Sequence, residues 1–162
     1  MTKRKNLIEK LGVHIEGKEQ IAPLAARILA TLILTGKQGT TFEALVCELG
    51  ASKSTISTHL TTLQAASRIT YYTKSGDRKK YFILIPDVMI HAMADMLKNW
   101  KCEQRLHLEI MEYKKEINES LPKDSDEIFD LEFHTDYLEF LNQASASIEK
   151  LQKKLTEKNT NN

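Results

Sequence analysis

The sequence predicts a mainly α-helical fold with one small β-hairpin, divided into two domains of residues 1–86 and 87–162. Glycine, proline and helix-capping residues separate four short helical patterns in the first domain. Two aromatic, β-branched segments follow, and the second domain holds two long helical patterns.

The charge of the chain divides at the same boundary. Residues 1–86 contain 13 Lys and Arg against 6 Asp and Glu, a net of +7, and residues 87–162 contain 10 against 16, a net of −6. The first domain is therefore expected to meet a polyanion.

Composition excludes several classes of protein. Of the 162 residues, 41% are hydrophobic, which is enough for the core of one small domain with a helical extension. The longest apolar stretch, residues 28–34, is too short to span a membrane, and no apolar signal segment follows the basic N-terminus. We therefore expect a cytoplasmic protein without membrane contact. Cys47 and Cys102 form no CxxC pair and are expected to be free thiols.

Capping residues place the four helices of the first domain. Pro23 suits the first turn of the second helix, where its missing N–H costs nothing. Thr40 and Glu43 have the spacing of a capping box for the third helix, and Ser52 caps the fourth. Glycines at 17, 36 and 50 end the first three helices. The predicted helices are bounded by residues 4–16, 23–36, 40–50 and 52–67.

A two-stranded hairpin is predicted after these helices. Residues 69–73 (ITYYT) and 80–85 (KYFILI) are rich in β-branched and aromatic side chains. Ser75-Gly76-Asp77 supplies the turn between them. Because an isolated hairpin is marginally stable, its strands must rest on the helices.

The second domain is predicted to form two long helices. Asp87 caps one that runs to about Leu121, and Asp124-x-x-Glu127 resembles a capping box for another that runs to about Lys158. The last helix carries an a/d heptad, as in a coiled coil, that needs an apolar partner, most simply the same helix of a second copy. An intramolecular helical hairpin without dimerisation is the alternative. The predicted dimerisation residues are Leu141, Ala144, Ile148, Leu151 and Leu155.

The fourth helix has two contrasting faces. At about 100° per residue, Ile56, Leu60 and Leu63 share one side with Ser67. Seven of the twelve residues from Ser52 to Leu63 carry hydroxyls, although Ser and Thr are mediocre helix formers. Short hydroxyl side chains let a helix approach phosphates and base edges closely, and a solvated polar face is the simpler alternative. The candidate DNA contacts on this helix are Lys53, Ser54, Thr55, Ser57, Thr58 and Thr61.

The order of helices followed by a hairpin is that of a winged helix-turn-helix, in which the hairpin is the wing. Lys74, Arg78 and Lys79 surround its turn and are candidate contacts to DNA phosphates or the minor groove. Asp77 is placed to bond turn amides or to orient Arg78. A charged, solvated turn without function is the alternative.

Three segments resemble the GbsR/MarR-type bacterial transcriptional regulators: PLAARILATLIL, TFEALVCELGASKSTISTHLTTL and GDRKKYF. The resemblance covers roughly residues 11–87. It implies a homodimeric winged-helix protein that binds a palindromic promoter site and often answers a small ligand. It also implies that Arg78 is the wing arginine and that DNA is contacted by Lys53, Ser54, Thr55, Ser57 and Thr58. The family often has glycine where Ala66-Ser67 stands here, so the end of the fourth helix departs from its pattern.

Other chemistry finds little support. The five histidines lack metal-ligand spacing, and no phosphate loop, nucleophile motif or catalytic carboxylate pair is present. We therefore expect neither an enzyme nor a metal or other cofactor. Cys47 leaves a thiol sensor open as an alternative, and Trp100 with Met93, Met96 and Met111 either lines an effector pocket or forms plain core.

The sequence therefore favours a homodimeric transcriptional regulator that binds double-stranded DNA, most simply a repressor occluding a promoter. A small-molecule effector near the long helices is the expected means of control. A helical protein-interaction adaptor and a redox- or metal-sensing regulator remain as alternatives.

Overall fold

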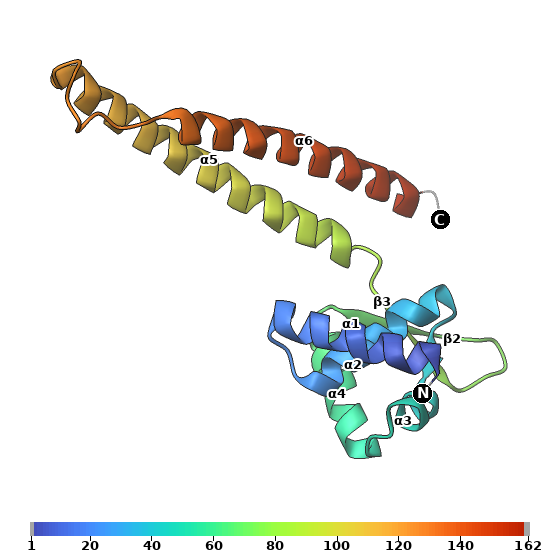
Figure 1. The fold of residues 1–162 in the computed structure, drawn as a ribbon. Coiled ribbons are helices and arrows are strands. Elements are labelled where there is room, and N and C mark those ends of the chain that lie inside the picture. The colour runs from blue at the N-terminus through green and yellow to red at the C-terminus, as the bar shows by residue number, and fades with distance from the viewer. Residues whose placement is uncertain (1, 161–162) are drawn as a thin grey trace. The chain divides into compact units, whose positions relative to one another are not determined.

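The structure, a computed structural model, describes residues 2–160 and divides into two compact units, with the boundary after Pro86. The first unit contains five helical segments and three strands, and the second is a pair of long helices (Figure 1). The elements of the first unit are α1 (Lys3–Glu19), α2 (Pro23–Thr35), η1 (Gly36–Gln38), β1 (Thr40–Thr41), α3 (Phe42–Leu49), α4 (Lys53–Ala65), β2 (Ile69–Thr73) and β3 (Lys80–Leu84). The second unit contains α5 (Val88–Ser120) and α6 (Glu132–Thr160).

Helix α2 is the centre of the first unit. It begins at Pro23, as predicted, and its Ile28, Leu29 and Leu32 are at most 1% exposed. Side chains from α1, α3, α4 and both long strands complete this core. Arg27 also donates to Glu9 at 2.9 Å and to Glu16 at 3.2 Å, which ties α1 to α2.

Helix α1 is longer than the sequence predicts. It continues through Gly17 to Glu19, and Gln20 closes it in the left-handed conformation with φ 52°. A glycine inside a helix costs only about 1 kcal/mol, which packing against α2 outweighs. The predicted end of the first helix at Gly17 was therefore wrong.

The sheet has three antiparallel strands in the order β1-β3-β2, rather than the two predicted. Thr40 pairs with Phe82 in β1, and Thr41 instead caps α3 by accepting from the Ala44 N–H at 3.2 Å. The predicted capping box at Thr40 was therefore one residue out of place. Gly39 admits this strand because it has φ 65° and because a Cβ there would lie 2.8 Å from the Phe82 carbonyl oxygen.

Helix α4 ends at Ala65, two residues before the predicted end. The Arg68 N–H reaches the Leu63 carbonyl at 2.9 Å, and the Ser67 N–H reaches the Gln64 carbonyl at 3.0 Å. These two hydrogen bonds form a Schellman motif, whose C′ residue is left-handed and most often glycine. Ser67 occupies that place with φ 54° and is exposed. It therefore ends the helix and does not join the apolar face.

Replacing Ser67 with glycine is expected to stabilise the protein by about 0.5–1 kcal/mol, because a non-glycine residue is strained in the left-handed region. The free energy of unfolding in urea measures this change. Ser75→Gly is the matched control, since Ser75 lies in the exposed wing turn without a positive φ. Equal effects of the two substitutions would contradict strain at Ser67.

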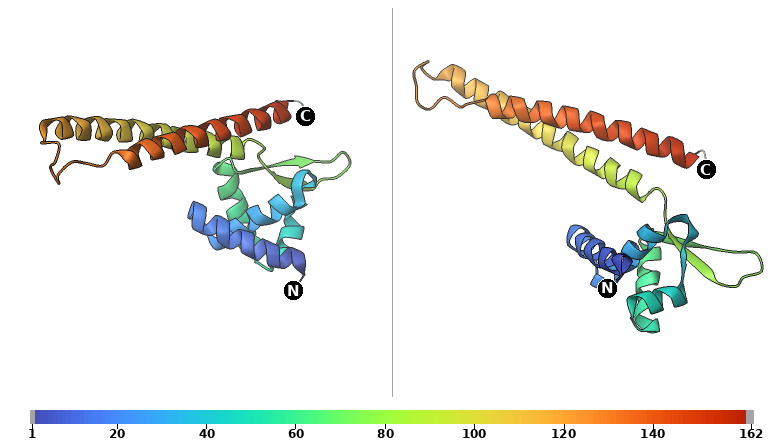
Figure 2. Two further views of the ribbon diagram at one scale, coloured as in Figure 1. Left: turned by 45° about the horizontal axis from the view of Figure 1, so that its top comes forward. Right: turned by 45° about the vertical axis from the view of Figure 1, so that its right-hand side comes forward.

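Helices α5 and α6 run antiparallel, side by side, in all three ribbon views (Figures 1 and 2). Helix α6 begins at Glu132, so the predicted capping box of Asp124 and Glu127 lies in the connection between the helices. Asn118 holds this connection by donating to the Phe129 carbonyl at 2.9 Å and accepting from its N–H at 2.8 Å. The predicted start of the last helix was therefore wrong.

The α5–α6 seam shares three positions with the predicted heptad. Leu141 is 1% exposed, and Ile148 and Leu155 are half-buried. Leu151 remains 46% exposed, because Ser145 and Gln152 take the intervening seam positions. Helices α5 and α6 of one chain thus form a hairpin through this seam. No helix in residues 2–160 combines the length and apolarity required to cross a membrane.

Candidate nucleic-acid interface

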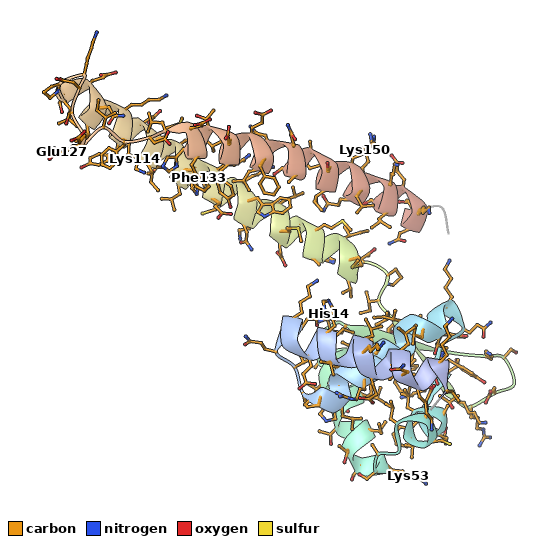
Figure 3. All side chains as sticks on the ribbon, viewed as in Figure 1. His14, Lys53, Lys114, Glu127, Phe133 and Lys150 are labelled. Atoms are coloured by element: carbon orange, nitrogen blue, oxygen red, sulfur yellow. The ribbon has the colours of Figure 1, made fainter. Side chains whose placement is uncertain are left out.

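Helix α4 begins at a cluster of hydroxyl side chains. Ser52 caps it by accepting from the Thr55 N–H at 3.2 Å, as predicted. Its Oγ also lies 2.6 Å from Thr55 Oγ1 and 3.0 Å from Ser54 Oγ. The first turn of α4 contains no acidic residue, so the positive end of the helix dipole is not neutralised by a first-turn carboxylate. Lys53 adds a full charge there, at the outer end of the helix (Figure 3).

The two faces of α4 separate as the spacing predicts. Ile56, Leu60 and Leu63 are at most 4% exposed and pack in the core. The face away from the core is open to solvent. All six candidate DNA contacts of this helix are exposed, namely Lys53, Ser54, Thr55, Ser57, Thr58 and Thr61.

The threonine hydroxyls on this face bond back to the helix. Thr58 donates to the Ser54 carbonyl and Thr61 to the Ser57 carbonyl, both at 3.0 Å, and Thr62 donates to the Thr58 carbonyl at 3.1 Å. Their hydroxyl hydrogens are therefore already used, and each oxygen remains an acceptor. With these hydrogen bonds formed, the three threonines offer oxygen acceptors and methyl groups. In a major groove the acceptors suit base amino groups, and the methyl groups suit the thymine methyl.

The wing between β2 and β3 reaches away from the helices of its unit in both further views (Figure 2). The Asp77 N–H bonds the Lys74 carbonyl at 3.0 Å, and Gly76 has φ 77°. A positive φ at the third of four residues is the requirement of a type II turn, which explains the glycine. The loop that follows carries Arg78 and Lys79.

Asp77 fixes this loop. Its carboxylate accepts from the Tyr81 hydroxyl at 2.7 Å and from the Lys79 N–H at 2.9 Å. The hydrogen bond from Tyr81, then that from Lys79, holds the pKa of the Asp77 carboxyl below its ordinary 3.8. The same hydrogen bond raises the pKa of the Tyr81 hydroxyl above 10.0. Asp77 therefore stays ionised at neutral pH and orders the backbone around Arg78.

The four cations of the wing fall into two classes. Lys74 Nζ lies 4.0 Å from the ring centre of Tyr81, and Lys80 Nζ lies 4.2 Å from that of Tyr71. Within residues 2–160, the side chains of Arg78 and Lys79 make no hydrogen bond, ion pair or ring contact. The candidate contacts are thus unequal. The charge of Lys79 helps to lower the pKa of Asp77, Lys74 lies on an aromatic ring, and Arg78 is left to meet an anion.

Aromatic pairs anchor the strands of the wing. The Tyr72 hydroxyl donates to the Gln38 carbonyl at 2.8 Å, and the Tyr72 ring stacks on Tyr81 at 5.5 Å. Phe82 is 6% exposed and joins the core. The base of the wing is therefore fixed to the helices, as the sequence predicts.

A second surface lies on α6, beside the α5–α6 seam. Phe133, Phe140 and Leu151 are 65%, 56% and 46% exposed. Their spacings of 7 and 11 residues place them within about 20° of one another around the helix. Tyr137 stacks between the two phenylalanines, at 5.7 Å and 6.0 Å. We call Phe133, Tyr137, Phe140, Ala144 and Leu151 the α6 stripe. The sequence reasoning missed its aromatic members, although the seven-residue spacing of Phe133 and Phe140 was a signal.

The other candidate sites are sparse. Within residues 2–160, no three His, Cys, Asp or Glu side chains gather to hold a metal ion, and Cys47 and Cys102 are exposed. Met93 is buried in the seam and Met96 is exposed. A groove of about 430 Å³ on α5 and α6 is lined by other residues: Ala94, Leu97, Lys98, Lys101, Arg105 and Gln152.

Comparison with known proteins adds support for the fold. No protein-family model and no curated protein matches the chain. A crystal structure described as a transcriptional regulator superposes with a TM-score of 0.50 at 20% identity, covering 96% of this chain and 99% of that one. A mutant of MepR from S. aureus gives a TM-score of 0.42 at 17% identity, covering 94% and 90%. The predicted fold class, mainly helical with a small antiparallel sheet in a winged-helix arrangement, is confirmed.

Proposed function

We propose that this chain is a homodimeric, DNA-binding transcriptional regulator of the GbsR/MarR type that represses by occluding an inverted-repeat promoter site. One observation carries the proposal. A helix with an exposed hydroxyl face and no acidic residue in its first turn lies in the same compact unit as a wing whose Arg78 and Lys79 are exposed. That unit has the +7 charge that a polyanion attracts.

The two parts of this surface suit different parts of a DNA duplex. Helix α4 presents small side chains, so its backbone could approach base edges in the major groove. The exposed cations of the wing suit phosphates or the minor groove, where a narrow groove attracts arginine. Phosphate contacts would position the protein, and the α4 hydroxyls would read sequence.

The α6 stripe supports the dimer. Phe133, Phe140 and Leu151 stay largely exposed in the hairpin even though Tyr137 stacks on both phenylalanines, and soluble proteins rarely leave such a stripe uncovered. A second copy would cover it with the same stripe, as two-fold symmetry requires. Such a dimer would present two α4 helices to half-sites about one helical turn of DNA apart.

The proposed control is a small-molecule effector. It would favour one distance between the two α4 helices of the dimer over another, and so change the affinity for DNA. The groove on α5 and α6 is where the second unit offers room for it. Its cations Lys98, Lys101 and Arg105 come from a single helix, α5.

Replacing Thr58 with alanine is expected to weaken binding to the cognate site by about 1 kcal/mol and to leave binding to random DNA nearly unchanged. Thr58 is exposed in the middle of the α4 face, and alanine removes its oxygen acceptor and its methyl group. Fluorescence anisotropy with both duplexes measures the difference. Equal losses on both duplexes would remove Thr58 from base reading.

Salt dependence tests the proposed function directly. If a dimer neutralises about six to eight phosphates, the logarithm of the association constant should fall against the logarithm of salt concentration with a slope of about −5 to −7. A protein-interaction adaptor built on the same fold would show no such DNA affinity. An association constant for DNA that does not change with salt concentration would therefore favour the adaptor and reject the regulator.

A further inference from the structure

The α5–α6 seam changes character along its length. Toward the start of α5 its buried members are mainly apolar, with Met93, Leu97 and Leu141 at most 7% exposed, and Ser145 is the small polar exception at 8%. Toward the connection between the helices, the buried member of α6 is instead His134, which is 6% exposed. Figure 3 labels Lys114 and Phe133 in this part of the hairpin. A histidine buried at the centre of a helix pair requires partners for both ring nitrogens.

Hydrogen bonds assign the protons of this site. Lys114 Nζ lies 2.9 Å from His134 Nε2, and an ammonium group can only donate. His134 Nε2 is therefore an acceptor, so in the neutral ring Nδ1 carries the hydrogen. His134 Nδ1 lies 3.0 Å from His107 Nδ1, which must then accept, so that His107 carries its own hydrogen on Nε2. The chain of donors and acceptors is complete only while both imidazoles are neutral.

Added protons have no acceptor among the hydrogen bonds that join Lys114, His134 and His107. A proton on His134 Nε2 would face the Lys114 ammonium, and a proton on His107 Nδ1 would face the His134 N–H. Burial, followed by the charges of Lys114 and His107, lowers the pKa of His134 below its ordinary 6.5. The Glu103 carboxylate, four residues before His107 on α5, accepts from the Tyr137 hydroxyl at 3.0 Å, and Tyr137 meets the His107 ring edge-on. A proton added to His134 is thus placed against the Lys114 charge, and one added to His107 is placed against another N–H donor.

The sign of the effect follows from these directions. Because the folded state holds His134 at a lower pKa than the unfolded state, the unfolded state binds more protons as the pH falls below 6.5. The contribution of neutral His134 to stability is fully present above 6.5 and diminishes as the pH falls toward the pKa of the folded state. Carboxylates keep their charge in this window, so the histidines dominate the response.

We propose that Lys114, His134 and His107 form an acid-sensitive switch in the α5–α6 hairpin, closed at neutral pH and opened at its connection end by proton uptake. The Lys114 ammonium sets the threshold, because it makes the neutral imidazole the favoured state. Phe133 and Tyr137 of the α6 stripe flank the switch and pack on the His107 ring. If this stripe is the dimer contact, which rests on the proposed function, acid would weaken the dimer and lower its affinity for DNA.

The test is a histidine NMR titration of the full-length protein labelled at its imidazole rings. We expect His134 to be the Nδ1–H tautomer at pH 7.5 and to titrate below the ordinary histidine pKa of 6.5. Lys114→Met should shift the His134 midpoint upward, and His14→Gln should leave it unchanged. A His134 midpoint at or above 6.5, or no shift in Lys114→Met, would overturn the proposal.

Unfolding and DNA binding complete the test. The urea midpoint should fall between pH 7.5 and 5.5 in the wild type and in His14→Gln, and fall less in Lys114→Met. Equal falls in all three proteins would contradict the switch. DNA affinity at the two values of pH tests only the coupling. Absence of DNA binding at pH 7.5 would reject the proposed function, whereas the NMR titration would still decide the switch.

Discussion

Arg78→Ala is expected to weaken binding of the dimer to its cognate DNA by about 1–3 kcal/mol, or about 5- to 150-fold. The guanidinium is exposed at the wing, beside the turn that Asp77 orders, and within residues 2–160 it makes no hydrogen bond, ion pair or ring contact. Removing it should therefore leave the stability of the fold unchanged. The loss should appear in DNA affinity alone and should reduce the salt slope.

Lys74→Ala is the matched control for Arg78→Ala, because it removes one positive charge from the same turn. The Lys74 ammonium lies over the Tyr81 ring, so its loss should cost less DNA affinity than the loss of Arg78. Anisotropy titrations of both variants at one salt concentration compare them. Equal small losses would mean that the wing acts only through its overall charge, and no loss in either would remove the wing from the interface.

Leu151→Asp is expected to dissociate the proposed dimer. The free energy of dimerisation should become less favourable by about 2–4 kcal/mol, because a carboxylate would be buried against an apolar partner. Leu151 suits this test because it is 46% exposed in the single chain. Ile148 is a poorer position, since it is half-buried in the seam and a charge there would also disrupt the hairpin. Sedimentation should show the mass falling from twice 18.5 kDa to 18.5 kDa.

Ala146→Asp controls for the added charge. Ala146 is exposed on α6 and lies five residues before Leu151, about 140° around the helix from it. The substitution should leave the dimer mass and the helix content unchanged. A monomeric mass for the wild type, or dimers of equal strength in both variants, would contradict a dimer formed through the α6 stripe.

Features encoded in a few neighbouring residues could be predicted from the sequence. Pro23 marks the start of α2, Ser52 caps α4, and Gly76 forms the wing turn, because each effect is local. The apolar face of α4 follows in the same way from a spacing of three and four residues. The exposed hydroxyl face could therefore be identified as the candidate site before its surroundings were known.

Features that depend on distant partners could not be predicted. Strand β1 has two residues, too few for any pattern, and it exists because Thr40 and Thr41 pair with β3. That pairing moves the cap of α3 from Thr40 to Thr41. Helix α6 begins late because Asn118, in another helix, binds the backbone of Phe129.

The seam of α6 shows why a heptad alone was ambiguous. Leu141, Ile148 and Leu155 belong to two possible seams of α6. One is completed by Ala144 and Leu151 and is the more apolar, and the other is completed by Ser145 and Gln152. The chain instead turns the set completed by Ser145 and Gln152 inward, and Gln152 donates to the Ile90 carbonyl at 3.3 Å. The ring hydrogen bond between His107 and His134 was likewise hidden, since the two residues are 27 positions apart.

The central claim, a dimer that reads a DNA sequence through α4 and the wing, is tested most directly by selecting bound fragments of the source genome with the purified protein. Sequencing of the fragments from wild type and Arg78→Ala should reveal one inverted repeat, enriched by the wild type and lost in the variant. Half-site centres should lie about one helical turn apart. No enrichment at low salt, or equal enrichment by both proteins, would contradict the claim.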